Sequence, residues 1–383
     1  MGLFQRGEDR VYSPKQKECF VKNLCIKSRN MKYKLLFLIF FCCVSCLIFG
    51  KNRVQVGAYY FDGWSGLSPD RNPKWATNAP THLTYKLKTE FTNREPIWGW
   101  RDDDVRIMEK QIDLASQNGI DFFAFCWYWY NDGKSINKTA IENSPLNTSI
   151  QLFLKAKNRN KMKFCVLIAN HQGHEIVGQG NWLSAIQYMK SKYFKSNSYL
   201  KVDNKPVIVV FDPWPLHNGK TTMSKADSLM MEAGFNGLYY IACGPNQNLF
   251  KYNLFTWYNT FPAQKFTTNR VPYKVLVDAA EEAWYKQPKL LPVAPIVMTG
   301  WDVRPWRSDS DKSIYYIDKT PLQFKRHLED AYDFILNRKT KEKFIFIYAW
   351  NELGEGGWLV PTKGDPSGEY LRQVKNVVKE YRK

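Results

Sequence analysis

Residues 105–129 read VRIMEKQIDLASQNGIDFFAFCWYW, and this stretch contains one complete helix-to-strand unit. Apolar residues in 105–118 recur at helical spacing, and Gly119 stands where such a helix would end. Residues 121–129 then form an almost unbroken apolar run, which is typical of a strand buried on both faces in a parallel sheet. The stretch therefore predicts helices alternating with parallel strands.

The same alternation continues from residue 54 to the end of the sequence. Strands are predicted at Gln55–Phe61, Asp121–Trp129, Lys163–Ala169, Pro206–Phe211, Leu238–Cys243, Leu254–Tyr258, Pro292–Thr299 and Lys343–Trp350. Helices are predicted at Val105–Asn118, Ser149–Asn158, Trp182–Phe194, Met223–Ala233, Tyr273–Tyr285, Leu322–Asn337 and Glu369–Arg382. This pattern predicts a single (β/α)8 TIM barrel in residues 51–383. A doubly wound open sheet is the alternative, but its glycine-rich first turn is not matched by FDGWSG at 61–66.

Residues 1–50 differ from the rest of the chain and have the character of a targeting segment. From Met31 the sequence reads MKYKLLFLIFFCCVSCLIFG, in which two lysines precede an apolar run that is short for a transmembrane helix. The run ends at Ser45-Cys46, which resembles a bacterial lipoprotein signal. We therefore expect translation to start at Met31 and Cys46 to be lipidated. The alternative is a signal anchor with residues 1–34 in the cytoplasm and residues 35–50 in the membrane. Both interpretations place residues 54–383 outside the cytoplasm, in the periplasm or at the cell surface.

Charge and cysteine usage narrow the classes of function. The chain has 55 Lys and Arg against 36 Asp and Glu, a net charge of +19. Such a surface suits nucleic acid, an anionic membrane or an acidic polysaccharide, or it reflects lysines scattered over solvated helices. The sequence has no zinc-finger spacing, RNP-like run or basic heptads, so we expect no nucleic-acid partner. Cys126, Cys165 and Cys243 lie in apolar runs, which predicts buried thiols, and no motif indicates a metal or other cofactor.

The ends of the predicted strands carry the candidate substrate-binding residues, because a (β/α)8 barrel places its chemistry at the C-terminal strand ends. Most of these ends combine an aromatic ring, on which a sugar can pack, with a carboxylate, amide or imidazole. The candidates are Tyr60, Asp62, Trp64, Trp127, Tyr128, Tyr130, Asn170, His171, Asp212, Trp257, Trp301, Asp302, Trp350 and Asn351. Strand alternation prevents Trp127, Tyr128 and Tyr130 from all facing inward. Asp212 and Asp302 are equally suited to capping loops, and His174 is a weaker candidate than His171.

The sharpest local feature is AWNELGEGGWLVP at residues 349–361. It places Glu352 and Glu355 three residues apart, directly after an apolar strand and among glycines. Glycoside cleavage generally uses two carboxyl groups, one to protonate the leaving oxygen and one as base or nucleophile. The alternative is that these glutamates stabilise the N-terminus of the last helix.

The segment 350–356 resembles the WNExxEG motif of glycoside hydrolase family 99 and of the related WbsX-type proteins. GIDFFAFCWYWYNDGK (119–134), NKPVIVVFD (204–212) and TGWDVRPW (299–306) are similar to other strand segments of that family. The resemblance covers roughly residues 55–362. It implies retaining cleavage of an α-mannoside through a 1,2-anhydro sugar, with Glu352 deprotonating the 2-hydroxyl and Glu355 serving as acid and then base. The chain departs from the family at Leu353, Gly354, Val360 and residues 169–172, and these departures bear on the preference for mannose.

Three functions follow from these observations. The first is a glycoside hydrolase acting on an exported polysaccharide or glycan. The second is a glycosyltransferase, the label often given to WbsX-type proteins, although the sequence shows no DxD motif and no basic cradle for a pyrophosphate. The third is a surface lipoprotein that binds glycans without cleaving them, against which the presence of both glutamates argues.

Overall fold

The computed structural model describes residues 53–65, 82–129, 138–171, 174–212, 219–244, 251–286 and 291–382. The chain divides into two units, residues 1–53 and 54–383, and all the elements below belong to the second. The predicted start at Met31, the export signal and Cys46 lie outside the described residues. Among the helices in the described ranges, none is both long enough and apolar enough to cross a lipid bilayer.

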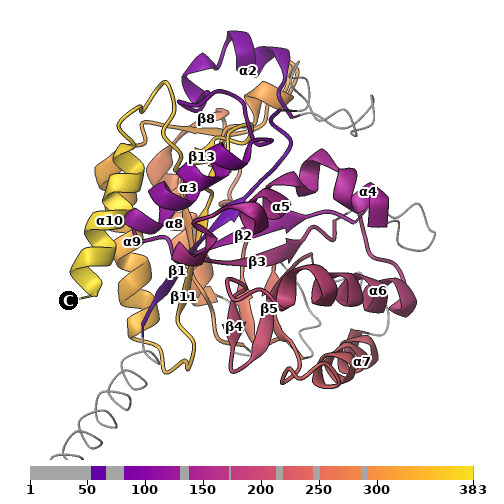
Figure 1. Ribbon diagram of the computed structural model, residues 1–383. Coiled ribbons are helices and arrows are strands. Elements are labelled where there is room, and N and C mark those ends of the chain that lie inside the picture. The colour runs from indigo at the N-terminus through magenta and orange to yellow at the C-terminus, as the bar shows by residue number, and fades with distance from the viewer. Residues whose placement is uncertain are drawn as a thin grey trace, which may run out of the picture. The chain divides into compact units, whose positions relative to one another are not determined.

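Eight parallel strands form a barrel in the middle of this unit (Figure 1). They are β1 (Gln55–Tyr60), β2 (Phe122–Trp127), β3 (Lys163–Ile168), β5 (Lys205–Phe211), β6 (Tyr239–Cys243), β7 (Leu254–Thr256), β9 (Ile296–Met298) and β11 (Phe344–Tyr348). They pair in the order β7-β6-β5-β3-β2-β1-β11-β9. The ring closes where Phe255 of β7 receives a hydrogen bond from Ala294 (2.8 Å) and donates one to Pro292 (2.9 Å), just before β9. The predicted TIM barrel is confirmed.

Helices surround the strands, as Figure 1 shows. The seven predicted helices are present as α3 (Val105–Gln117), α5 (Thr148–Lys155), α6 (Gln179–Met189), α7 (Gly219–Met231), α8 (Tyr273–Lys286), α9 (Pro321–Leu336) and α10 (Glu369–Tyr381). Gly119 follows α3 with φ +90°, a conformation that glycine adopts without a steric penalty. The last helix packs on its neighbour, because Tyr381 of α10 stacks on Tyr332 of α9 with ring centroids 4.6 Å apart.

Short elements lie between the main ones and were too brief for periodicity to reveal. They are α2 (Tyr85–Thr89), α4 (Lys138–Asn143), β4 (Lys201–Val202), β8 (Arg270–Pro272), β10 (Tyr315–Ile317), β12 (Asn351–Glu352), β13 (Gly357–Trp358) and four 3-10 turns at Thr92–Arg94, Pro145–Asn147, Arg159–Lys161 and Arg304–Trp306. The predicted helix Trp182–Phe194 continues beyond α6 as a π turn at Lys190–Phe194. The predicted strand Pro292–Thr299 is shortened to β9. Pro292 and Pro295 cannot donate backbone hydrogen bonds, although both accept one.

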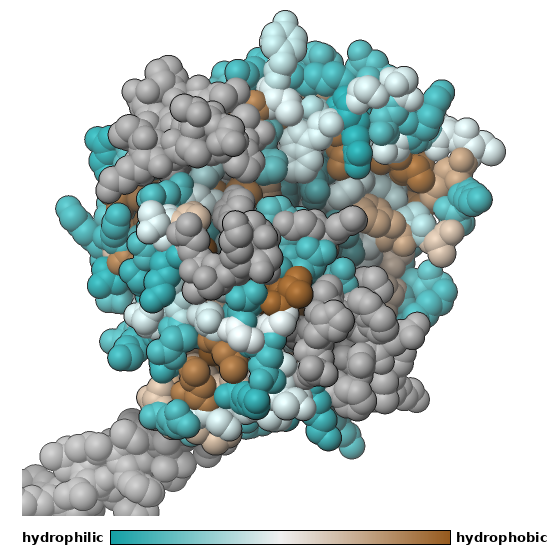
Figure 2. Space-filling view, turned by 90° about the vertical axis from the view of Figure 1, so that its right-hand side faces the viewer, coloured by the Kyte–Doolittle hydropathy of each residue, from teal (hydrophilic) through white to brown (hydrophobic). Residues whose placement is uncertain are grey.

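Strand alternation decides which side chains face the barrel interior and which face the helices. Tyr59 and Phe346 stack inside the barrel, with ring centroids 5.3 Å apart. Trp350 packs instead on Phe123, and its indole N–H donates to Gln111 of α3 at 2.7 Å. The three cysteines of the barrel are buried free thiols, as predicted. On the face drawn in Figure 2, hydrophilic residues predominate and apolar ones form small separate areas.

Candidate active site

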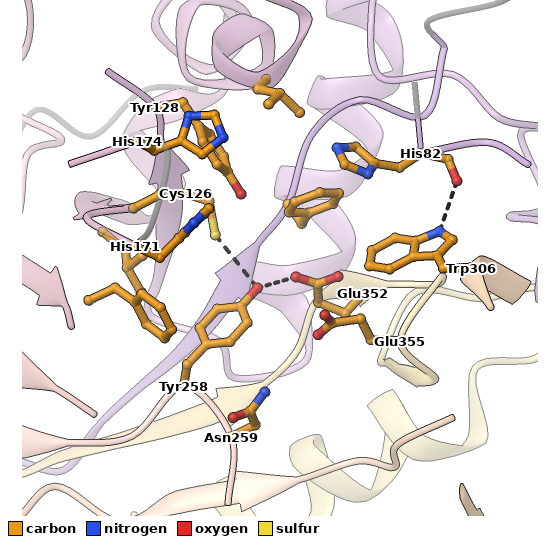
Figure 3. Close-up of a pocket in the computed structure, with 15 residues that line it drawn as sticks. His82, Cys126, Tyr128, His171, His174, Tyr258, Asn259, Trp306, Glu352 and Glu355 are labelled. Carbon is orange, nitrogen blue, oxygen red and sulfur yellow. Dashed lines mark hydrogen bonds between the residues drawn. The ribbon is translucent and has the colours of Figure 1, made fainter. Parts of the chain in front are cut away.

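A cavity of about 380 Å³ opens at the C-terminal ends of the barrel strands. Figure 3 shows the two glutamates side by side on one wall and the His171–His174 pair across from them. The lining residues are Phe61, His82, Cys126, Tyr128, Leu146, Leu167, Ala169, His171, His174, Phe211, Tyr258, Asn259, Trp306, Glu352 and Glu355. They include aromatic, amide, imidazole and carboxyl groups, which are the groups a sugar pocket requires.

Glu352 is the more deeply buried carboxyl group, with 2% of its surface exposed. Tyr258, which follows β7, donates a hydrogen bond from its hydroxyl to Oε1 of Glu352. The Sγ atom of Cys126 on β2 lies 3.6 Å from the same hydroxyl oxygen. Oε2 of Glu352 is buried and has no hydrogen-bond partner among the described residues. Burial raises the pKa of Glu352 well above its usual range, and the charge of Glu355 raises it further, while the Tyr258 hydrogen bond opposes both.

Glu355 accepts a hydrogen bond at Oε2 from the hydroxyl of Tyr348, the last residue of β11. Burial raises the pKa of Glu355 to about 7, although the Tyr348 hydrogen bond and the positive charge of Arg307 lower it. The two glutamates therefore sit in one water-poor cavity, where ionising both costs more than ionising one. Such a pair is suited to holding one proton and one negative charge near neutral pH.

The loop that carries both glutamates is a tight hairpin between β12 and β13. Gly356 has φ +87°, and a Cβ there would lie 2.4 Å from the backbone nitrogen of Asp302, so only glycine fits. At Gly354, a Cβ would lie 2.1 Å from the ring of Trp306, which lines the cavity. The departure from the resembled motif at Gly354 thus has a physical reason, because the missing side chain makes room for Trp306.

Three histidines line the cavity, and two of them are held in the neutral form. Burial lowers the pKa of His82 to about 4, and the nearby His174 contributes a smaller part of this shift. Nε2 of His82 is buried and has no hydrogen-bond partner in the described ranges. Burial and the neighbouring His171 also lower the pKa of His174. No group of three or more His, Cys, Asp or Glu side chains in the described part of the chain is arranged to hold a metal ion.

The structure brings five of the predicted candidates to the cavity: Tyr128, His171, the weaker candidate His174, Glu352 and Glu355. Tyr128 faces the cavity, whereas Trp127 packs outside the barrel against Tyr188 and Trp129, as alternation along β2 requires. Tyr130 lies outside the described residues.

Several predicted polar residues turn out to support backbone near the cavity and do not line it. Asp62 accepts hydrogen bonds from the backbone and hydroxyl of Ser149 in the first turn of α5. Asn351 binds the backbone of Phe61 through both amide atoms, at 2.8 and 2.7 Å. Asn170 donates to the carbonyl of Asp212 and accepts from the backbone of Ile176. Asp302 is paired with Arg94 and Arg304.

The remaining predicted aromatic residues are not among the residues that line the cavity. Asp212 does not line it either, and its backbone has a positive φ of 43°. Tyr60 and Trp350 are core residues that face the helices. Trp64 packs on Trp100 and Trp306, Trp257 on Phe255, and Trp301 on Phe261 and Tyr348. Tyr60, Trp64 and Trp350 are buried, whereas Trp257 and Trp301 are half-buried.

Several lining residues were not among the predicted candidates. Tyr258 ends the predicted strand Leu254–Tyr258, next to the candidate Trp257, and Asn259 follows it, while His82 precedes α2. Cys126 and Phe211 occupy inward positions of β2 and β5, so alternation counted from Tyr128 would have identified Cys126. Trp306 ends the segment 299–306, which is similar to a strand segment of the resembled family. Its indole N–H donates to the carbonyl of His82 at 3.0 Å.

Removing the Tyr258 hydroxyl tests the role of Glu352. Because its hydrogen bond stabilises the charged carboxylate, Tyr258→Phe is expected to raise the pKa of Glu352. If Glu352 acts as a base, the acidic limb of the pH–activity profile moves to higher pH and kcat falls by about 10-fold at pH 6. Tyr252→Phe is the control, since Tyr252 is also buried but lies outside the cavity lining. An unshifted acidic limb in Tyr258→Phe contradicts this role.

A family model described as Glycosyltransferase WbsX matches residues 100–374, most of the chain. The chain belongs to this WbsX family. A relative of this WbsX-family chain is an uncharacterized protein, WxcX, from Xanthomonas campestris pv. campestris, 23% identical over 286 residues. That alignment covers 67% of this chain but only 39% of the relative, so the chain spans about two fifths of the relative's length.

Solved structures similar to this WbsX-family chain include glycosidases. A GH99 endo-alpha-mannosidase from Bacteroides thetaiotaomicron superposes with a TM-score of 0.57 at 15% identity, covering 86% of this chain and 97% of that one. A family 1 β-glucosidase from Thermotoga maritima gives a TM-score of 0.50 at 10% identity, over 86% and 98% of the two chains. These likenesses show the fold, and together with the WbsX family they place the chain among carbohydrate-active proteins.

Proposed function

We propose that residues 54–383 form a glycoside hydrolase in which Glu352 and Glu355 carry the reaction. The observation that supports this proposal most is a pair of buried carboxyl groups with raised pKa values on one wall of one cavity. A carboxyl group near pKa 7 can remain protonated long enough to act as a general acid at neutral pH. In this role Glu355 protonates the leaving oxygen, and activity declines as pH rises through about 7 because Glu355 then loses its proton.

The charge of the cavity supports a neutral sugar as the substrate. None of the described lining residues is Lys or Arg, although the whole chain carries a net charge of +19. Its two glutamates supply the negative charge of the cavity, and His82 and His174 are held neutral. A carboxylate on the bound sugar would be stripped of water beside Glu352 and Glu355, and no cationic side chain among the described lining residues would compensate it. Arg307, whose charge acts on Glu355, does not line the cavity.

A matched pair of substrates tests both the hydrolase activity and the preference for neutral sugars. Purified residues 51–383 are incubated with an aryl α-hexoside and with the corresponding aryl α-hexuronide, alongside defined neutral and acidic polysaccharides. We expect kcat/KM for the hexoside to exceed that for the hexuronide by at least about 100-fold, because the uronate buries an unpaired charge. Faster cleavage of the hexuronide would overturn the neutral-substrate proposal.

A glycosyltransferase is the second candidate, and the name of the family favours it. A transferase that uses a nucleotide sugar must hold a diphosphate, for which the described cavity lining offers no cationic side chain. Cleavage in H₂¹⁸O separates the two functions. Hydrolysis places ¹⁸O on the released sugar, whereas transfer to an added acceptor gives a glycoside without the label. The export predicted from residues 31–50 favours hydrolysis, because nucleotide sugars are made in the cytoplasm.

A further inference from the structure

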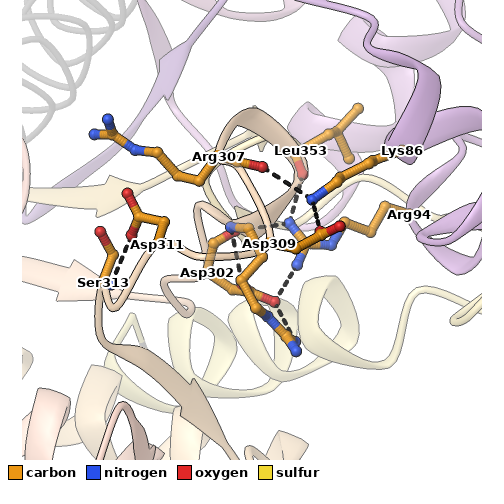
Figure 4. A network of polar contacts seen from close by, with 9 residues as sticks. Lys86, Arg94, Asp302, Arg307, Asp309, Asp311, Ser313 and Leu353 are labelled. Carbon is orange, nitrogen blue, oxygen red and sulfur yellow. Dashed lines mark hydrogen bonds and ion pairs between the residues drawn. The ribbon is translucent and has the colours of Figure 1, made fainter.

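Arg94 reaches the loop that carries both glutamates from a distant part of the sequence. It ends the 3-10 turn Thr92–Arg94, and only 4% of its side chain is exposed. Its Nη1 donates to the carbonyl oxygens of Leu353 at 2.9 Å and of Asp302 at 3.0 Å, and its Nη2 pairs with the Asp302 carboxylate. Figure 4 shows this guanidinium between Leu353 and the Asp302 segment.

These contacts fix the glutamate loop at two points. Leu353 stands between Glu352 and Glu355, so Arg94 holds the backbone directly after the first glutamate. The backbone N–H of Asp302 donates to the carbonyl of Glu355 at 2.5 Å and so holds the backbone at the second. Arg94 joins the two points, because it binds both Leu353 and Asp302.

Burial of this guanidinium is costly unless its contacts compensate the loss of water. Burial lowers the pKa of Arg94 to about 10, while the charge of Asp302 opposes that shift. Its ring contacts, with Phe91 at 4.7 Å and Trp358 at 5.5 Å, enclose the group further. The cation is therefore held in a fixed place by several partners, as expected of a group that holds backbone in a required geometry.

We propose that Arg94 is a positioning residue that holds the Glu352–Glu355 loop so that both carboxyl groups face the same cavity. The proposal rests on the hydrolase function proposed above for this pair. A shift of about 1 Å in a reacting group can cost on the order of 100-fold in rate without a comparable loss of binding. Arg94 itself does not line the cavity.

Arg304 provides a matched control for Arg94. It pairs with the same carboxylate, from Nε to Oδ1 of Asp302 at 2.8 Å and from Nη2 to Oδ2 at 2.9 Å. Its side chain is 45% exposed, and its ring contacts are with Phe91 and Tyr315, away from the glutamate loop. A substitution at Arg304 therefore disturbs the ion pair without touching the Leu353 carbonyl.

The experiment compares Arg94→Lys with Arg304→Lys on a glycoside that the wild-type protein cleaves. We expect kcat of Arg94→Lys to fall by about 100-fold with KM within about threefold of wild type, because a single ammonium cannot span Leu353 and Asp302. Both limbs of its pH profile should shift, since a changed spacing of the carboxyl pair changes their coupling. Arg304→Lys should keep kcat within about threefold and an unchanged pH profile.

Hydrogen–deuterium exchange provides a readout that does not depend on activity. Amides of residues 351–357 should exchange faster in Arg94→Lys than in Arg304→Lys or wild type. If the wild-type protein cleaves no glycoside, the hydrolase proposal fails while exchange still tests Arg94. Equal kcat and equal exchange in the two lysine variants would overturn the Arg94 proposal. Should Arg94→Lys fail to fold, Arg94→Gln, which removes the buried charge and keeps one donor for Leu353, is measured against the same expectations.

Discussion

Replacing Glu355 by Gln is expected to lower kcat on an unactivated glycoside by about 10²–10⁴-fold, because the amide cannot protonate the leaving oxygen. The substitution keeps the size of the side chain and removes a carboxyl group whose pKa burial has raised to about 7. Binding of an oligosaccharide, measured by calorimetry, should change little, since the proton transfer contributes mainly in the transition state. The basic limb of the pH profile assigned to Glu355 should also disappear.

Glu329→Gln is the control for this substitution. Glu329 lies on α9 and pairs with Lys325, away from the cavity lining. It should leave kcat unchanged. Turnover by Glu355→Gln within about threefold of wild type would show that another group supplies the proton. If the wild-type protein and Glu355→Gln bind the oligosaccharide equally and the wild-type protein does not cleave it, the result instead favours a protein that binds glycans without cleaving them.

The second large effect concerns the 2-hydroxyl of the substrate. Tyr258 donates a hydrogen bond to Oε1 of Glu352 and so favours its ionised form, against the burial that raises its pKa. Oε2 has no partner among the described residues and can accept a proton when Glu352 is ionised. We propose that this oxygen takes the proton of the sugar's 2-hydroxyl as that hydroxyl oxygen bonds to its own anomeric carbon. The glycosidic bond breaks in the same step, Glu355 protonates the departing oxygen, and a 1,2-anhydro sugar remains. A 2-deoxy-2-fluoro glycoside lacks that nucleophile, so its cleavage should be slower than that of the 2-hydroxy compound by at least about 10³-fold.

Mass spectrometry of the intact protein distinguishes this route from the ordinary retaining mechanism. In the ordinary mechanism a carboxylate bonds to the anomeric carbon, and a fluorosugar with a good leaving group traps that ester. We expect the protein to keep its unmodified mass after incubation with the fluorosugar. The 2-hydroxy glycoside with the same leaving group serves as the control and must be cleaved. An added sugar mass that maps to Glu352 would make Glu352 a conventional nucleophile.

The fold was predictable because its information is local and repeated. Each buried strand is an apolar run, and most strands alternate along the chain with a helix that has its own periodicity. Residues 105–129 contain one such helix followed by its strand. The strand that follows Pro292 shows where this reasoning stops. Its apolar run is continuous, but two prolines lack the N–H groups that a longer strand would need.

The kinds of side chain in the candidate site were predictable from the sequence, but only some of the residues that line the cavity were. Glu352 and Glu355 stand out because one short loop carries both of them. Tyr60 and Trp127 were placed with the candidates because they end strands, yet one position along a strand decides whether a side chain faces the cavity or the helices. Tyr258 ends a predicted strand one residue after the candidate Trp257, so strand alternation could have identified it. His82 lies outside every predicted element, and only the closed barrel brings it to the cavity.

The strands around the barrel are not joined by equal numbers of hydrogen bonds. Between β7 and β9 the ring is held by the two hydrogen bonds of Phe255, whereas the β2–β3 pair runs in register over six residues. Tyr258 lies three residues beyond Phe255, and its bond to Glu352 spans β9 to reach the loop after β11. If this seam opened, the Tyr258 contact that favours ionised Glu352 would be lost. The pKa of Glu352 therefore depends on a hydrogen bond that crosses the β7–β9 seam.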